Sequence, residues 1–249
     1  MCATCGCGQP DPVSGHSHHQ RHDTLRLLKI EQDLLAKNDR YATSNRNWLN
    51  ERAILVLNLV SSPGAGKTSL LVQTLKDLKS EIPFAVIEGD QQTSRDTDRI
   101  RGCGVPAIQI NTGKGCHLDA HQIGHALRDL EPVSGSVVMI ENVGNLVCPA
   151  AFDLGEDGKV VVLSVTEGDD KPIKYPNMFH EARLMIISKI DLLPHVDFDV
   201  AQCIEYARRI NQKLEVIQLS VKTGVGLESW YRWLRREHEL KVGTPAEVS

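Results

Sequence analysis

Short apolar runs alternate with longer amphipathic stretches along most of the chain. Runs typical of buried strands lie at 54–57, 84–87, 106–110, 137–140, 160–165, 184–187 and 216–219. Helix-like spacing of apolar residues falls between most of them, as at 199–211 and 227–240. This alternation predicts an α/β fold in which helices cover both faces of a mostly parallel sheet. Ligands bind such folds at the carboxyl ends of the strands, so candidate site residues follow each run.

The chain before the first strand has two parts of different character. Residues 1–23 contain few core-forming residues and many Cys and His, which predicts a flexible metal-binding tail. Residues 24–50 carry apolar residues at helix-like intervals, which predicts a linking helix packed on the core or on a second subunit. We therefore expect a main domain at 51–242 and a disordered end at 243–249.

The first strand leads into a turn of small residues, Ser61-Ser62-Pro63-Gly64-Ala65-Gly66-Lys67-Thr68, and a helix pattern follows it. Backbone N–H groups at such a helix start bind phosphate, Lys67 adds a charge, and the Thr68 hydroxyl can bind Mg²⁺. Ser61 stands where the usual pattern has Gly. The turn predicts a nucleoside triphosphate site, formed by Ser62, Gly64, Ala65, Gly66, Lys67, Thr68 and Ser69.

Carboxylates end two of the predicted strands. Asp90 follows the run at 84–87, and Glu141 follows the run at 137–140. Mg²⁺ prefers carboxylate and hydroxyl oxygens, so we place Thr68 and Asp90 near the ion, with Glu141 acting directly or through water. With Lys67, these residues are the predicted catalytic set, and Gly144 lets its loop approach a γ-phosphate. The alternative is that both carboxylates are solvated strand ends.

The choice of base is indicated by Asp191, in Ser188-Lys189-Ile190-Asp191 after a predicted strand. Its carboxylate can accept two hydrogen bonds from guanine that adenine cannot donate, and the stem of Lys189 can cover the base. GTP-binding proteins usually have Asn at the position of Ser188. The loop after the last strand is similar to the one that backs the base in such proteins; it contains Ser220, Val221 and Lys222.

Thiols and imidazoles gather in the tail. Cys2, Cys5 and Cys7 can wrap one metal ion, and removal of Met1 would add the α-amine of Cys2 as a fourth donor for Ni²⁺ or Zn²⁺. Nearby histidines suit a weaker store of the same ions; they are His16, His18, His19 and His22. The alternative is a disordered tail with incidental Cys and His.

A second metal site is predicted inside the main domain, from Cys116, His117 and Cys148. If a helix starts near His117, then His117, His121 and His125 share one face of it. The alternative is structural Cys with surface His. The remaining thiols, Cys103 and Cys203, have no neighbouring ligands in the sequence, so we expect them in the core or on the surface. The charged loop around 171–176 fits either a functional edge of the nucleotide site or a solvated surface.

Composition excludes several classes of function. The formal net charge is −4 and aromatic residues make up 4% of 249 residues, which argues against a nucleic-acid partner. No apolar run approaches the roughly 20 residues that cross a bilayer, and the N-terminus is not a secretion signal. We expect a cytoplasmic protein, in which seven Cys serve as thiols or metal ligands rather than disulfides.

Together these motifs resemble the HypB family, GTPases that help insert nickel into [NiFe]-hydrogenase. The resemblance rests on the tail thiols and on the segments 61–68, 86–92, 111–119, 141–149 and 174–176. It implies a SIMIBI-class P-loop G domain with Mg²⁺, a tight nickel site at the tail thiols, and a weaker nickel or zinc site at Cys116, His117 and Cys148. It also implies a GTP-dependent homodimer, a HypA-type metallochaperone and the hydrogenase large-subunit precursor as partners, and a SlyD-type prolyl isomerase as a further candidate.

The leading hypothesis is therefore a metallochaperone that hydrolyses GTP to GDP and phosphate. The loop after Gly144 would sense the γ-phosphate and move Cys148 on hydrolysis. Three alternatives stay open at this point: a urease-type nickel-insertion GTPase, a non-enzymatic nickel-storage protein, and a small-molecule kinase. The tail thiols argue against the first, the intact Lys67 and Asp191 against the second, and the absence of an acceptor-binding segment against the third.

Overall fold

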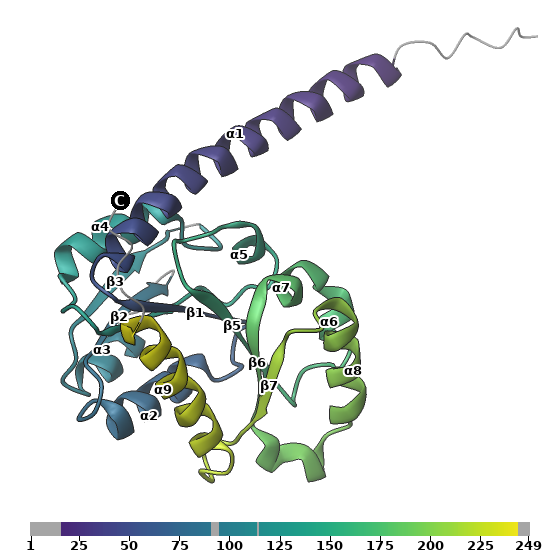
Figure 1. Cartoon of the computed structure of the whole chain (residues 1–249). Helices are drawn as coiled ribbons and strands as arrows, with labels where there is room; N and C mark the ends of the chain where they lie inside the picture. Colours follow the sequence, from purple (N-terminus) through teal and green to yellow (C-terminus); the bar gives the residue numbers. More distant parts are fainter. Residues whose placement is uncertain (1–15, 91–94, 114, 244–249) are drawn as a thin grey trace, which may run out of the picture. The chain divides into compact units, whose positions relative to one another are not determined.

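A computed structural model describes residues 16–90, 95–113 and 115–243 (Figure 1). The chain divides into two compact units, residues 1–37 and residues 38–249. Helix α1 (His16–Asn50) begins before the predicted start at Thr24 and continues past the boundary between the units. The division therefore falls inside this helix. The tail thiols Cys2, Cys5 and Cys7 lie outside the described residues.

A single parallel sheet forms the centre of the second unit. In the described part of the chain it has seven strands in the order β3-β2-β4-β1-β5-β6-β7 (Figure 1). The strands are β1 (Leu55–Ser61), β2 (Phe84–Asp90), β3 (Ala107–Asn111), β4 (Val137–Glu141), β5 (Gly158–Ser164), β6 (Ala182–Ser188) and β7 (Glu215–Gln218). Each predicted apolar run corresponds to one of them, so the predicted α/β fold with a parallel sheet is confirmed.

Helices connect successive strands and cover the sheet. They are α2 (Lys67–Leu78), α3 (Arg95–Arg101), α4 (Ala120–Leu130), α5 (Cys148–Ala151), α6 (Lys171–Lys174), α7 (Pro176–Glu181), the 3-10 helix η1 (Ile190–His195), α8 (Val200–Ile210) and α9 (Leu227–Gly243). The last two match the predicted helices at 199–211 and 227–240. Within the described ranges, no helix is both long enough and apolar enough to span a bilayer.

The sheet is apolar on both faces because helices pack on both. Alternate residues of the central strand β1 enter different clusters: Leu57 lies in the cluster that α2 and α9 complete, and Val56 lies in the cluster that contains Leu127 of α4. Val60 joins a further cluster with residues of α7 and α8. Buried on both sides, β1 is a nearly continuous apolar run, as parallel strands are.

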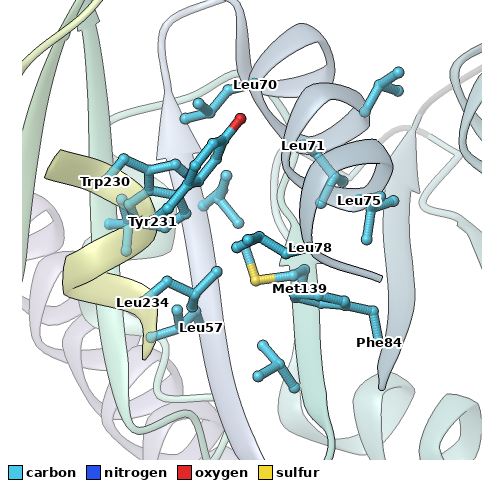
Figure 2. Packing of buried hydrophobic residues seen from close by; sticks show 14 of the residues in the cluster. Leu57, Leu70, Leu71, Leu75, Leu78, Phe84, Met139, Trp230, Tyr231 and Leu234 are labelled. Atoms are coloured by element: carbon cyan, nitrogen blue, oxygen red, sulfur yellow. The ribbon is translucent and has the colours of Figure 1, made fainter. Parts of the chain in front are cut away.

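Helices α2 and α9 are joined on one face of the sheet. Figure 2 shows Trp230, Tyr231 and Leu234 of α9 packed beside Leu57, with the leucines of α2 nearby. Two polar contacts fix this arrangement, because the Trp230 indole N–H donates to Thr74 at 2.8 Å and the Tyr231 hydroxyl donates to Asp77 at 2.5 Å. The helix that follows the phosphate loop therefore packs on the sheet beside α9 and is joined to it.

Candidate nucleotide and metal site

The turn between β1 and α2 has the backbone that its glycines predict. Gly64 and Gly66 have positive φ angles of 75° and 103°, which L side chains rarely adopt, and Gly66 is the N-cap of α2. Lys67 begins the helix, and its ammonium donates to the Ser61 hydroxyl at 2.7 Å. The serine in place of the usual glycine thus supplies a hydroxyl contact to this lysine.

A cavity of about 630 Å³ opens above this turn. It brings together residues predicted for the phosphates and the metal ion, namely Gly64, Gly66, Lys67, Thr68, Ser69, Asp90, Glu141 and Gly144. Parallel pairing aligns Leu59 of β1 and Glu88 of β2 with Glu141, so these strands reach the cavity at the same level. The carboxyl ends of β1, β2 and β4 therefore build the site, as the fold class predicts.

The Thr68 hydroxyl donates to Glu141 Oε1 at 2.7 Å, and Asp90 lines the same cavity. A hydroxyl and two carboxylates offer the hard oxygen ligands that Mg²⁺ prefers, and the cavity leaves room for the water molecules that this ion usually keeps. The donor set therefore fits Mg²⁺. Glu141 is only 6% exposed, so a cation beside it would offset the cost of a buried carboxylate.

A second cavity of about 380 Å³ adjoins the first, because Gly66, Ser69 and Lys189 line both. The remaining residues predicted to bind the base lie in its wall together with Ala65 of the phosphate loop; they are Asp191, Ser220, Val221 and Lys222. The Ser220 hydroxyl donates to Asp191 Oδ1 at 2.6 Å, which holds the carboxylate in place. Loops after β6 and β7 thus meet the phosphate loop, and they form a pocket with a single oriented carboxylate.

Ser188 has a role that its position in the sequence does not reveal. Its hydroxyl donates to the Ala65 carbonyl at 2.7 Å, and the adjacent Lys189 donates to the Gly64 carbonyl at 2.7 Å. Lys189 has a left-handed backbone with φ of 59°. Ser188, which replaces the usual Asn at this position, therefore joins the base loop to the phosphate loop by a hydrogen bond.

Ser62, predicted to bind phosphate, lies outside the residues that line either cavity. Its hydroxyl accepts from Lys171 Nζ at 3.2 Å, and Lys171 also pairs with Glu167 at 3.3 Å. Arg99 of α3 also lines the phosphate cavity; it follows β2, whereas Lys171 follows β5 on the other side of β1 in the sheet. Arg99 was missed as a candidate residue of the nucleotide site. Lys171, whose charged loop was considered as an edge of this site, lines neither cavity and contacts the phosphate loop through Ser62.

The structure brings Cys116, His117 and Cys148 together. Their ligand atoms all lie within 4.8 Å of one another, the Cys116 thiol donates to Cys148 Sγ at 2.9 Å, and Cys116 Sγ lies 3.4 Å from His117 Nδ1. Both cysteines are free thiols. Two sulfurs and one imidazole nitrogen form a donor set that suits Ni²⁺ or Zn²⁺.

The surroundings of this metal triad, Cys116, His117 and Cys148, set its protonation. The hydrogen bond to Cys148 and burial raise the pKa of the Cys116 thiol, and burial lowers the pKa of His117. A neutral imidazole has a lone pair available for a metal, whereas each thiol must release a proton on binding. Metal binding here is therefore expected to weaken as the pH falls.

The prediction that His117, His121 and His125 share one helical face is wrong for His117. Helix α4 begins at Ala120, because Asp119 caps it: the Asp119 carboxylate accepts from the Gln122 N–H at 2.8 Å and the Gln122 side chain accepts from the Asp119 N–H. His117 precedes the cap and lies with the thiols instead. The Asp-x-x-Gln spacing was the sequence signal for this helix start.

The metal triad and the phosphate cavity are in contact. Cys116 lines the cavity, and the Cys116 carbonyl accepts from Asn145 at 3.4 Å. Gly144 lies against the phosphate loop, where a β-carbon on it would stand 3.0 Å from the Pro63 backbone. The loop that ends in Cys148 therefore packs on the phosphate loop at one end and carries a metal ligand at the other.

A buried polar chain, missed from the sequence, links the metal triad to β1. Asn142 accepts from the Leu118 N–H at 3.3 Å and donates to Asn58 Oδ1 at 3.2 Å. Asn58 in turn donates to Glu156 at 3.1 Å, and Glu156 pairs with the buried Lys159 at 3.2 Å. A lone Asn within the apolar run of β1 was the available signal, since a buried amide requires hydrogen-bonding partners.

The main unit also contains the end of α1 from Asn38 onward, and two asparagines there hold the segments beyond the metal ligands. Asn38 accepts from the Ala120 N–H at 2.9 Å and donates to the Asp153 carbonyl at 2.7 Å. Asn45 donates to the carbonyls of Ala120 at 2.7 Å and Leu154 at 3.1 Å. These side chains connect the segment after His117 with the segment after Cys148.

The sequence profile of the CobW/HypB/UreG nucleotide-binding domain matches residues 55–218. The chain belongs to this family. It is 61% identical over 217 residues to the hydrogenase maturation factor HypB of Azotobacter vinelandii, an alignment that covers 87% of this chain and 72% of that protein. The HypB branch is thus the one that it resembles, as the motifs predicted, and the family is one of P-loop GTPases.

Solved HypB structures have the same fold. HypB from Archaeoglobus fulgidus superposes with a TM-score of 0.77 at 40% identity, covering 82% of this chain and 99% of that one. HypB from Helicobacter pylori in complex with nickel superposes with a TM-score of 0.76 at 40% identity, covering 85% and 100% of the two chains. The P-loop G-domain fold predicted from the sequence is therefore confirmed.

Proposed function

We propose that this HypB-family protein is a GTP-hydrolysing metallochaperone that binds nickel and helps insert it into the [NiFe]-hydrogenase large subunit. One observation carries the proposal: Cys116, a member of the metal triad, lines the same cavity as Lys67 and Thr68 of the phosphate loop. A nucleotide and a metal ion bound here would be neighbours. The relatives named hydrogenase maturation factor and the nickel complex of one of them support nickel as the cargo.

Guanine is the base that the second cavity favours. The Asp191 carboxylate can accept from the ring N–H and the exocyclic amine of guanine together, with Ser220 keeping it oriented at 2.6 Å. Adenine offers no such pair, so a bound adenine would cover Asp191 without supplying its hydrogen bonds. A site of this kind discriminates by at least about a hundredfold.

Hydrolysis then requires charge stabilisation and a positioned water molecule. Lys67 exchanges its contact with Ser61 for the phosphate oxygens, and the backbone N–H groups around Gly64 and Gly66 surround the same oxygens. Thr68, with Asp90 and Glu141, would hold Mg²⁺, which neutralises charge on the phosphates when it is bound. Ser69 lines the phosphate cavity, Ala65 lines the adjoining cavity, and Ser62 lies in the same loop in contact with Lys171.

Coupling between hydrolysis and metal release would run through the loop at Gly144. A γ-phosphate in the cavity would press on this loop at its contact with Pro63, and loss of the phosphate would let it move. Cys148 lies at the far end of the loop, so its distance from Cys116 and His117 would change. Nickel, or zinc in the same site, would then be held in one nucleotide state and released in the other.

The family resemblance supports the assembly that this cycle would serve. We include a GTP-dependent homodimer, a HypA-type metallochaperone and the hydrogenase large-subunit precursor as partners, with a SlyD-type prolyl isomerase as a further one. The tail thiols Cys2, Cys5 and Cys7 would be the tighter nickel site.

Turnover of GTP and ATP, with and without one equivalent of Ni²⁺, tests the proposal. We expect GTP to be strongly preferred in the wild type, Lys67→Ala to abolish turnover, and Cys148→Ala to remove the response to Ni²⁺. Cys203→Ala is the matched control, because it removes a buried thiol from another cluster. Equal use of ATP, or turnover that survives Lys67→Ala, would exclude the GTPase. Absence of turnover in the wild type would favour a nickel-storage protein. A response to Ni²⁺ that persists in Cys148→Ala would exclude the coupling.

A further inference from the structure

The imidazole of His117, a member of the metal triad, lies against the ring of Phe152. The two ring centroids are 4.0 Å apart, and the ring planes are tilted by 44° to each other. Both side chains are half-buried. Phe152 has no atom that binds a metal ion, and it lines neither cavity of the nucleotide site. Its ring can therefore act on the triad only through the position of His117.

The imidazole is held with one particular nitrogen toward the thiols. His117 Nδ1 lies 3.4 Å from Cys116 Sγ. Bonds to Zn²⁺ are about 2.3 Å long from sulfur and about 2.0–2.1 Å long from nitrogen, so at the tetrahedral angle they place the two ligand atoms about 3.6 Å apart. Nδ1 already stands at nearly this separation from the sulfur. The ring therefore needs little further rotation to bind a metal ion together with the thiols.

The backbone on both sides of Phe152 is fixed. Phe152 is the C-cap of α5, and Cys148 begins the same helix four residues earlier. The next residue, Asp153, pairs with Arg46 at 2.6 Å, and its carbonyl accepts from Asn38 at 2.7 Å. One short helix therefore supplies both a thiol ligand and the surface on which the imidazole ligand rests.

Rotation of the ring is the main freedom that remains to His117. The residue after it, Leu118, is 0% exposed, and its N–H donates to Asn142 at 3.3 Å. Asp119 then caps α4, so the backbone beyond the imidazole is fixed as well. A side chain that has to be ordered when a ligand binds lowers the affinity. A ring turned away from the thiols would lose its contact with Phe152, so the contact favours the orientation that binds metal.

We propose that Phe152 is a positioning residue of the metal triad, whose ring holds the His117 imidazole with Nδ1 directed at the metal ion. The inference rests on the proposed metal-binding function and deepens it, because it names the residue that orients the third ligand. Groups that orient a metal ligand typically contribute about tenfold or more to metal affinity. Phe152→Leu keeps an apolar side chain but removes the flat ring, so it should weaken metal binding at the triad about tenfold.

The triad can be studied in the full-length chain after the tail thiols are removed by Cys2→Ser, Cys5→Ser and Cys7→Ser. This parent protein, with ¹⁵N-labelled histidines, is titrated with ZnCl₂ in the presence of a chelator of known affinity. The ring signals of His117 are assigned by their loss in His117→Ala. Zn²⁺ should shift the Nδ1 signal and leave Nε2 protonated. In Phe152→Leu we expect an affinity about tenfold lower, and a fraction of His117 that stays unbound at saturating Zn²⁺.

Two further variants separate positioning from general stability. Phe152→Tyr keeps the ring and should bind Zn²⁺ as tightly as the parent protein. Phe198→Leu is the matched control, because Phe198 is 9% exposed in another cluster and its replacement should destabilise the fold without changing the Zn²⁺ affinity. Unchanged affinity in Phe152→Leu, or an equal loss in Phe152→Tyr or in Phe198→Leu, would overturn the proposal. If the parent protein binds no Zn²⁺ at His117, the metal triad itself is overturned, and the proposed function fails with it.

Discussion

Truncation of Asn142 to alanine tests whether the buried polar chain holds the metal triad to the sheet. Asn142 is 2% exposed, accepts from the N–H groups of Leu118 and Val143, and donates to Asn58 Oδ1. The substitution leaves two partners in the interior, the Leu118 N–H and Asn58 Oδ1, without these hydrogen bonds. At about 1 kcal/mol each, the low end for an unsatisfied buried group, the loss is about 2 kcal/mol of unfolding free energy. For a domain of this size that corresponds to a fall in Tm of about 4–8 °C.

Urea unfolding of the wild type and Asn142→Ala measures this loss directly. Asn177→Ala is the matched control, since Asn177 is exposed on α7 and its truncation should change stability by no more than about 0.5 kcal/mol. Asn58→Ala and the double variant complete a cycle. Because Asn58 and Asn142 share one hydrogen bond, the double variant should lose less stability than the sum of the single losses.

A loss below about 1 kcal/mol for Asn142→Ala, indistinguishable from the surface control, would refute the reasoning. Strict additivity with Asn58→Ala would refute the shared bond in particular. A variant with the expected loss should also bind nickel more weakly at the triad, because Leu118 follows His117 directly. Unchanged nickel affinity would show that the buried polar chain stabilises the sheet without affecting the metal ligands.

Two further predictions concern backbone strain and pH. Gly226→Ala should unfold the protein or cost several kcal/mol of unfolding free energy, because φ is 80° and a β-carbon would lie 2.0 Å from the Gln218 carbonyl oxygen. Thermal unfolding measures this loss, and Gly243→Ala, where a β-carbon meets open space, is the control. Burial opposes ionisation of Asp153, but hydrogen bonds from Arg46 and the Gly155 N–H outweigh it and lower the pKa of this carboxyl. Its contribution to stability is complete above the ordinary Asp pKa of about 3.9 and is lost as the pH falls through the lower folded value. The difference in urea stability between wild type and Arg46→Met should therefore be constant above about pH 4 and shrink below it; a constant difference down to pH 2 would contradict this.

Much of the nucleotide site could be predicted because its signals are local. The backbone of the phosphate loop depends on Gly64 and Gly66, which adopt conformations that other residues avoid. Asp90 and Glu141 were predicted to lie near each other because parallel strands end at one edge of the sheet. The structure places both beside the loop in one cavity.

Residues that act through distant partners could not be assigned in this way. Asn58 was visible as a polar residue in an apolar strand, but its partners Asn142 and Glu156 lie more than 80 residues away in the chain. The contact of Lys171 with Ser62 likewise joins segments 109 residues apart. Such pairs depend on strand order and loop packing, which a hydrophobic pattern does not specify.

The amino-acid sequence by itself determined the order of strands and helices, the phosphate loop, and the residues able to bind a base and a metal. These follow from apolar spacing, from glycine conformation and from ligand chemistry, all of which act over a few residues. Only the tertiary structure decided that Cys116 and Cys148, 32 residues apart, meet at 2.9 Å beside the cavity of the phosphate loop, and that His117 joins them while His121 and His125 form a pair of their own. The physical reason is that parallel pairing of β3 with β2 and of β2 with β4 brings the ends of β3 and β4 to the same edge of the sheet, and the Asp119 cap starts a helix between His117 and His121.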